Sequence, residues 1–189
     1  MKRPLFAAAL LLAACGQEGG NVSTPEADRS APRPEGKGER PKTSLLQALG
    51  GSADHKTLAN AVRAAGLTET LSGAQPYTLF APTEAAFQKL PAGAANGLLA
   101  PESKGQLVAL LTGHIVPGVV TAADLGKAVE RGKGKAELAT VGGSNLSFSR
   151  DGDALVVTDA AGGRARITGA EQVASNGVVH SVDGVLQSR

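Results

Sequence analysis

A histidine near the C-terminus is the residue of this chain whose position most suggests chemistry. His180 lies in the run SNGVVHSVDGVL, and in a strand it would share one face with Val178 and Val182, while Ser181 and Asp183 would point the other way. A histidine on an apolar strand face is a candidate catalytic base, a candidate metal ligand or a buried structural group. Each of these interpretations requires a different set of partner residues.

The sequence lacks the residue patterns that catalysis or metal binding would require. Ser181 cannot hydrogen-bond to His180 within one strand, and the chain has no G-x-S-x-G turn for a nucleophilic serine. The histidines His55, His114 and His180 show no HxH or HExxH spacing, so we expect no metal site and no cofactor. We expect no enzymatic activity and interpret His180 as a buried, hydrogen-bonded structural residue, since an unpaired buried polar group costs about 1–3 kcal/mol.

The N-terminal residues predict export and lipid attachment. Lys2 and Arg3 precede an apolar stretch from Leu5 to Leu12, which is shorter than the roughly 20 residues of a membrane-spanning helix and typical of a signal segment. The following LAAC resembles a bacterial lipobox, in which cleavage leaves a lipidated cysteine as the first mature residue, and Cys15 is the only cysteine. The alternative is an ordinary cleavage site at which Cys15 stands by chance.

These features predict a three-part chain. A lipoprotein signal peptide over residues 1–14 is followed by the lipidated Cys15 and a Gly-, Pro- and Ser-rich disordered tether over residues 15–42, and one folded domain occupies residues 43–189. Acyl chains on Cys15 would anchor the exported protein to a bacterial membrane, at the outer membrane, the cell surface or in the periplasm. Loss of Lys2 and Arg3 with the signal peptide cancels the formal net charge of +2, so we expect no nucleic-acid partner.

Hydrophobic periodicity predicts an α+β domain. Apolar residues recur at helical spacing after residue 43, Tyr77–Phe80 has the pattern of a buried strand, and Thr83 and Thr121 are suited to cap the helices that follow them. From about Lys135 short β-like runs alternate with Gly, Asn and Asp turns. Helices first and strands later are typical of the α+β class.

Three segments resemble the motifs of the fasciclin domain, in the same order and at similar separations. They are YTLFAPTEAAFQKLP, GHIVPGVVTAADL and ASNGVVHSVDGVL, and the resemblance extends from about Thr43 to Gln187. It implies a fasciclin-like fold in which a helical layer packs on a β-wedge of short strands. It also implies a mostly extracellular or surface-attached interaction module without enzymatic activity.

Three departures from the family pattern bear on function. Gly113 precedes His114 where many relatives have tyrosine, and the chain contains no Arg-Gly-Asp, so integrin-type binding is not expected. Glu84 stands where Asp or Asn is frequent. We expect Thr83, His114, His180 and Asp183 to form a polar network that joins the outer two motifs.

The expected function is that of a lipid-anchored adhesion or interaction module that binds another protein or a matrix or envelope partner. Arg131, Arg164 and Arg166 lie beside predicted turns and are the candidate interaction surface, because arginine is a frequent interface anchor. The alternative is a carrier of a small apolar ligand such as a pigment or lipid, although four Phe, one Tyr and no Trp leave few aromatic side chains to line a pocket.

Overall fold

The computed structural model describes residues 41–91, 93–169 and 171–187, with only the backbone of Ala95 and Asn96. The described residues belong to one compact unit. The predicted signal peptide, Cys15 and the predicted tether as far as residue 40 lie outside the described residues. None of the helices within the described part is long and apolar enough to cross a membrane.

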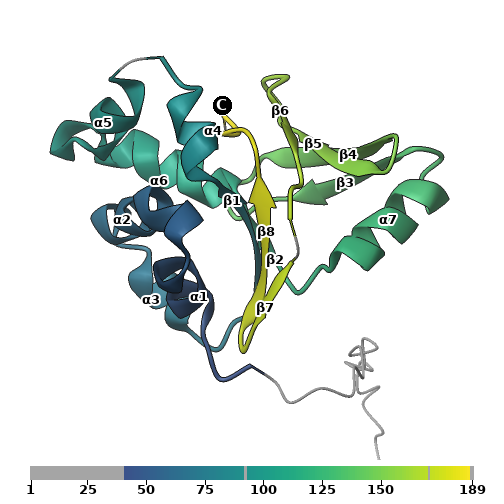
Figure 1. The fold of residues 1–189 in the computed structure, drawn as a ribbon, viewed down its shortest axis with the longest axis horizontal. Helices are drawn as coiled ribbons and strands as arrows, with labels where there is room; N and C mark the ends of the chain where they lie inside the picture. Colours follow the sequence, from purple (N-terminus) through teal and green to yellow (C-terminus); the bar gives the residue numbers. More distant parts are fainter. Residues whose placement is uncertain (1–40, 92, 170, 188–189) are drawn as a thin grey trace, which may run out of the picture. The chain divides into compact units, whose positions relative to one another are not determined.

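The first half of the unit is mainly helical (Figure 1). Its α-helices are α1 (Leu45–Gly51), α2 (Lys56–Ala65), α3 (Thr68–Ser72), α4 (Glu84–Gln88), α5 (Ala94–Leu99) and α6 (Lys104–Gly113), with 3-10 turns at Ala53–His55 and Pro101–Ser103. Local signals begin and end several of them. Ser44 forms a capping box at α1, and Gly66 ends α2 in the left-handed conformation that glycine adopts without strain.

The strands form a mixed sheet and an antiparallel sheet. The mixed sheet has the order β2-β1-β8-β7 and consists of β1 (Tyr77–Pro82), β2 (Ile115–Pro117), β7 (Gln172–Ala174) and β8 (Gly177–Val182), with β1 and β8 parallel. The antiparallel sheet has the order β3-β4-β5-β6 and consists of β3 (Lys135–Ala139), β4 (Asn145–Asp151), β5 (Ala154–Thr158) and β6 (Arg164–Arg166). Helix α7 (Ala122–Arg131) begins at the capping box of Thr121 and precedes β3.

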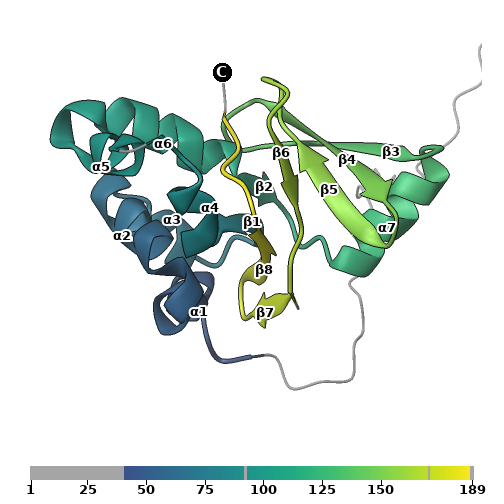
Figure 2. The same cartoon turned by 45° about the horizontal axis from the view of Figure 1, so that its top comes forward.

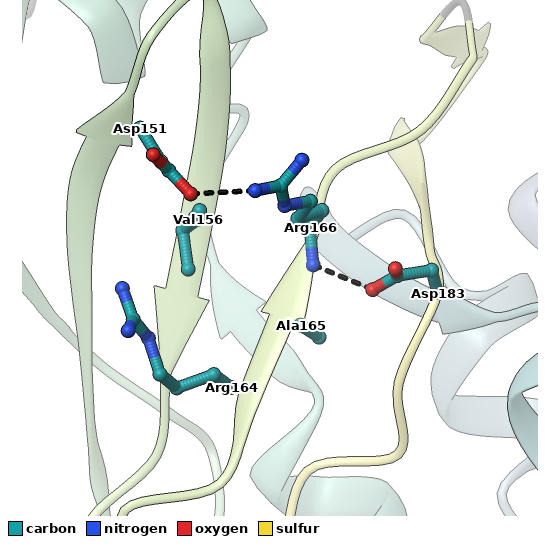
Figure 3. Close-up of a pocket in the computed structure, with 6 residues that line it drawn as sticks. All are labelled: Asp151, Val156, Arg164, Ala165, Arg166 and Asp183. Atoms are coloured by element: carbon teal, nitrogen blue, oxygen red, sulfur yellow. Dashed lines mark hydrogen bonds and ion pairs between the residues drawn. The ribbon is translucent and has the colours of Figure 1, made fainter. Parts of the chain in front are cut away.

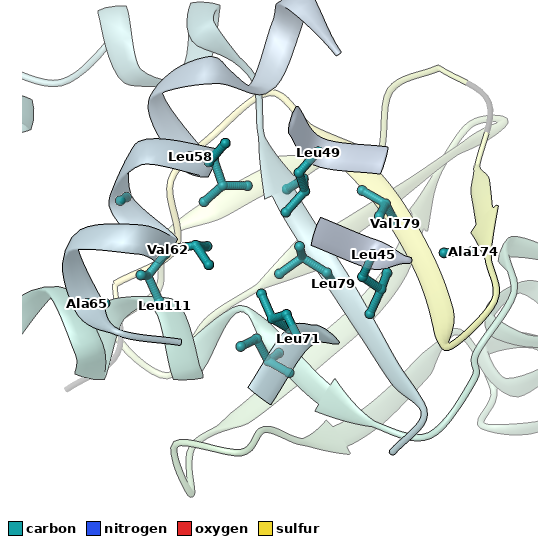
Figure 4. Packing of buried hydrophobic residues seen from close by; sticks show 14 of the residues in the cluster. Leu45, Leu49, Leu58, Val62, Ala65, Leu71, Leu79, Leu111, Ala174 and Val179 are labelled. Atoms are coloured by element: carbon teal, nitrogen blue, oxygen red, sulfur yellow. The ribbon is translucent and has the colours of Figure 1, made fainter. Parts of the chain in front are cut away.

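The mixed sheet separates two hydrophobic clusters, because successive side chains of its strands point to opposite faces. Helices α1, α2, α3 and α6 cover one face, where Leu79 and Val179 lie in the first cluster (Figure 4). The antiparallel sheet and α7 lie on the other side of the mixed sheet (Figure 2), and there Phe80 and Val182 belong to the second cluster. Each strand of the central β1–β8 pair therefore contributes to both clusters.

This arrangement confirms the predicted α+β class, with helices packed on short strands, but it differs from the sequence prediction in three strands. Strand β1 continues through Pro82 instead of ending at Phe80, and neither β2 nor β7 was predicted. The amide of Phe80 bonds to the His114 carbonyl on the β2 side, whereas the amide of Thr83 bonds to the Val182 carbonyl on the β8 side. The backbone nitrogen of Pro82 faces the same side as the amide of Phe80, at a point where the pairing with β2 has already ended. The missing N–H of Pro82 therefore costs no hydrogen bond between strands.

Candidate interaction surface

His180 is buried beside Phe80, a member of the second cluster. Its ring stacks on Phe80 with a centroid distance of 5.4 Å, and its Nε2 lies 2.8 Å from the carbonyl oxygen of Val120. Thr78, on the same face of the mixed sheet, accepts a hydrogen bond from the Val120 amide and donates one to the Gly118 carbonyl. His180 and Thr78 together hold the loop between β2 and α7 against the sheet.

His114 holds the C-terminal segment from within the protein interior. It ends α6, its Nδ1 lies 2.8 Å from the Leu110 carbonyl oxygen, and its Nε2 accepts a 3.0 Å hydrogen bond from the Leu186 amide. Burial lowers the pKa of His114 to about 4, against smaller opposing effects of the Leu110 carbonyl and the Asp159 carboxylate. Asp159 accepts a 2.6 Å hydrogen bond from the next amide, that of Gln187. The consecutive amides of Leu186 and Gln187 therefore both donate hydrogen bonds to side chains from distant parts of the sequence.

Thr83 and Asp183 act at two further places. The Thr83 hydroxyl accepts a hydrogen bond from the Ala86 amide and caps α4. The Asp183 carboxylate accepts a 2.7 Å hydrogen bond from the Arg166 amide, and the Asp183 amide donates to the Arg166 carbonyl. These two bonds tie the end of β8 to β6 and so connect the two sheets.

The structure does not bring Thr83, His114, His180 and Asp183 into one network. Strand alternation already places His180 and Asp183 on opposite faces of β8. None of the four side chains, all of which lie in the described part, bonds to another of the four, and each binds a main-chain group instead. The expectation of a joint network is corrected: each of the four side chains makes its own separate contacts with the main chain.

His55 pairs with a serine that the sequence analysis did not assign to it. Its Nε2 lies 3.3 Å from the Ser181 hydroxyl and its Nδ1 lies 3.1 Å from the Ser52 hydroxyl, and burial lowers its pKa although Asp54 and Glu84 are nearby. A catalytic histidine is usually oriented by a carboxylate on its second nitrogen, and here that position is taken by a hydroxyl. No spacing in the sequence predicts this pair, because His55 and Ser181 are 126 positions apart.

Glu84 has a structural role as well. Its carboxylate accepts hydrogen bonds of 2.6 Å from the Thr57 amide and 2.8 Å from the Thr57 hydroxyl. It therefore satisfies an amide at the N-terminus of α2, where a negative charge is favoured. Across the described residues, no group of three or more His, Cys, Asp or Glu is arranged to hold a metal ion.

The structure brings Arg164 and Arg166 together and places Arg131 elsewhere. Arg164 and Arg166 are exposed on β6 on either side of the buried Ala165, so both side chains leave the same face of the strand. Arg131 ends α7 and lies next to the start of β3, at the opposite edge of the antiparallel sheet. Its Nε donates to the Lys127 carbonyl. The expected surface of three arginines therefore contains only two neighbours.

The outer face of the antiparallel sheet is polar. Strand pairing aligns Glu137, Ser147, Thr158 and Arg164 in one row across the sheet, and Lys135, Ser149, Val156 and Arg166 in the next. The alternate residues, among them Phe148, Val157 and Ala165, belong to the second cluster. We call the two rows the outer face.

A small pocket lies at the β6 edge of the outer face (Figure 3). It has a volume of about 240 Å³ and is lined by Asp151, Val156, Arg164, Ala165, Arg166 and Asp183. Arg166 donates a 2.6 Å hydrogen bond from Nη2 to Asp151. The sequence analysis selected Arg164 and Arg166, but it did not identify Asp151 and it assigned Asp183 to a different group of residues.

Comparison with known proteins agrees with this fold. The fasciclin domain family matches residues 53–188. The chain is 41% identical to Protein sll1483 of Synechocystis over 144 residues, which is 76% of this chain and 72% of that protein. It is 31% identical to the transforming growth factor-beta-induced protein ig-h3 of Sus scrofa over 147 residues, 78% of this chain but 20% of that protein.

A solved structure shows the same fold. The FAS1 domain pair of the insect cell adhesion molecule Fasciclin I superposes with a TM-score of 0.69 at 19% identity, covering 78% of this chain and 52% of that chain. The chain thus spans about half of that domain pair. Fasciclin domains occur in adhesion proteins and in secreted proteins, and the family is generally non-enzymatic. The match over residues 53–188 and the 41% identity show that this chain belongs to the fasciclin domain family.

Proposed function

We propose that the protein is an exported, lipid-anchored module of the bacterial cell envelope that binds another macromolecule without catalysing a reaction. The observation that carries this proposal is the outer face, on which four strands present two rows of mostly polar side chains. The hydroxyls of Ser147, Ser149 and Thr158 have no hydrogen-bond partner among the described residues, so they are free to bond to a partner.

The anchor is supported by the sequence alone. Cys15 follows an apolar segment and small residues as a lipobox requires, and the segment up to residue 42 has the composition of a tether. The pocket described above gives no support to an apolar ligand, since four of its six lining side chains are charged. Membership of a family found in adhesion proteins supports a macromolecular partner.

Substitution of the outer face is expected to abolish binding. Ser147→Glu places a carboxylate at the centre of the outer face, and we expect retention of the envelope partner by the immobilised full chain to fall at least about tenfold, because the bulk and the negative charge of the new side chain oppose docking. The matched control is Gln106→Glu on the exposed side of α6, which adds the same charge and should retain the partner. Equal retention by both variants, each with the wild-type melting temperature, would contradict the proposal.

Lipid attachment is tested separately with Cys15→Ser. The variant has no thiol to acylate, so we expect metabolic labelling with a fatty acid to disappear and the protein to move from the detergent phase to the aqueous phase. The measurement is phase partitioning of wild type and variant side by side. A variant that still partitions with detergent would show that Cys15 is not the anchor.

A further inference from the structure

We propose that the pocket at the β6 edge binds a carboxylate side chain of an acidic protein partner, with Arg164 as the cation that recognises it. This inference rests on the proposed function, because it names the chemistry of the partner that docks on the outer face. Three observations support it: the ion pairs around the pocket, the volume and lining of the pocket, and the hydroxyl groups that lie next to it on the outer face.

The charges around the pocket leave one cation without an anion. Asp151 is paired with Arg166 at 2.6 Å, and Asp183 is paired with Lys89 at 3.5 Å and also accepts the Arg166 amide. The Arg164 guanidinium has no ion pair or hydrogen bond within the described part of the chain. Each carboxylate of the pocket therefore has its own cationic partner, and Arg164 remains available to an added carboxylate.

The shape and lining of the pocket suit a single acidic side chain. A volume of about 240 Å³ is below the range of about 300–1,000 Å³ that is common for whole small-molecule ligands. The buried Val156 offers an apolar floor to methylene groups, and Figure 3 shows Arg164, on β6, beside Val156, on the neighbouring strand β5. A planar guanidinium can bind a carboxylate through two parallel hydrogen bonds.

Hydroxyl groups continue the site across the outer face. Thr158 is the strand partner of Arg164, and Ser147 is the strand partner of Thr158, so two hydroxyls follow the guanidinium in one row. Both hydroxyls can donate to the carbonyl oxygens of a partner backbone or to a second carboxylate. These two hydroxyls therefore extend the site from Arg164 as far as Ser147, and Glu137 ends the row.

The aromatic residues of the domain favour a polypeptide over an acidic polysaccharide. Sugar rings commonly stack on exposed aromatic side chains, and the described aromatic residues are all engaged elsewhere. Phe80 and Phe148 are buried in the second cluster, whereas Tyr77 and Phe87 pack against the first. Recognition on the outer face has to use hydrogen bonds and charge, which an acidic protein segment supplies.

The test uses the full chain and hexaglutamate as the probe, titrated calorimetrically at low ionic strength. Arg164→Gln is expected to weaken binding about tenfold, because it removes a charge-assisted pair from a partly enclosed site. Arg164→Lys should lose less, since it keeps the charge but not the bidentate geometry. The matched control is Arg131→Gln, which makes the same change at the opposite edge of the sheet and should alter the dissociation constant less than about twofold.

Several outcomes would overturn the inference. Equal weakening by Arg131→Gln and Arg164→Gln would show general attraction of charge and no site, and wild-type affinity in Arg164→Gln would exclude the pocket. Tighter binding of polygalacturonate than of hexaglutamate, with the same dependence on Arg164, would replace the protein partner by a polysaccharide. If Ser147→Glu retains the envelope partner, the proposed function fails, whereas envelope retention that is lost with Ser147→Glu but unchanged in Arg164→Gln rejects the carboxylate site alone.

Discussion

Acidification from pH 6.5 to about 4 is expected to remove about 3 kcal/mol of folding free energy through His114 alone. In the folded protein burial lowers the pKa of His114 to about 4, whereas in the unfolded chain the ring titrates near 6.5. Between these pH values the unfolded state binds a proton that the folded state excludes. The stabilisation is therefore complete above pH 6.5, is lost as the pH falls, and changes no further below about 4.

The contacts of His114 explain where the acid effect would begin. Its Nε2 is the acceptor of the Leu186 amide, so a proton on this nitrogen would place two donors against each other and a charge in the interior. Leu186 is a buried member of the second cluster. The C-terminal segment is therefore expected to detach first. His55, whose pKa burial also lowers, adds to the loss in the same direction.

The measurement is the free energy of unfolding by denaturant as a function of pH, for wild type and for His114→Gln. The neutral amide cannot titrate, so its stability should fall less steeply between pH 6.5 and 4. If this variant does not fold, an NMR titration of the wild-type imidazole decides the question. A His114 ring that takes up a proton near pH 6.5 in the folded protein would contradict the prediction.

Gly177→Ala is expected to destabilise the fold by more than about 3 kcal/mol. Gly177 is the first residue of β8 and pairs with Tyr77 of the parallel strand β1. A Cβ atom at this position would lie 1.9 Å from the Tyr77 carbonyl oxygen and 2.9 Å from Leu45 Cδ1. Relief requires the two central strands to separate at this end, which disrupts the sheet that both hydrophobic clusters share.

The neighbouring Asn176 prevents the turn from moving aside. Its side chain accepts a 2.9 Å hydrogen bond from the Leu45 amide and donates to the carbonyls of Leu71 at 2.8 Å and Gly73 at 2.9 Å. The turn before β8 is thus fastened to the start of α1 and the end of α3. A displacement of Gly177 would break these bonds as well.

The control for Gly177→Ala is Gly105→Ala in α6, where an added Cβ meets no atom within 4 Å. Alanine is the better helix former, so this variant should be unchanged or up to about 1 kcal/mol more stable. Thermal and denaturant unfolding of both variants provide the comparison. Similar stability of Gly177→Ala and wild type would show that the β1–β8 pair adapts to the side chain.

Local sequence patterns predicted the elements of the domain well. The capping residues Thr83 and Thr121 act within a few residues of their own positions, and the structure has both of them in the predicted role. The alternation of β8 likewise predicted that His180 faces the interior and Ser181 the opposite side. These features depend on backbone geometry and near neighbours, which the sequence order itself supplies.

Long-range pairing was not predictable from the same patterns. Strands β1 and β8 lie parallel although residues 83–176 separate them in sequence, and this pairing brings His180 against Phe80. Thr83, His114, His180 and Asp183 were expected to meet, yet each found a main-chain partner. A polar side chain binds whichever unsatisfied group the folded chain places beside it, and only the packing of distant segments decides which group that is.

The arginines illustrate the same division. Alternation along β6 is a local property, and it sends Arg164 and Arg166 to one face. Strand order and register place Arg131 at the far edge of the antiparallel sheet and pair Asp151 with Arg166. They also leave Arg164 without a partner among the residues that the structure describes. The direction of a side chain on a strand is determined within a few residues. The residues that can neutralise its charge come from other strands, so only the assembled sheet determines which arginine is available to a partner.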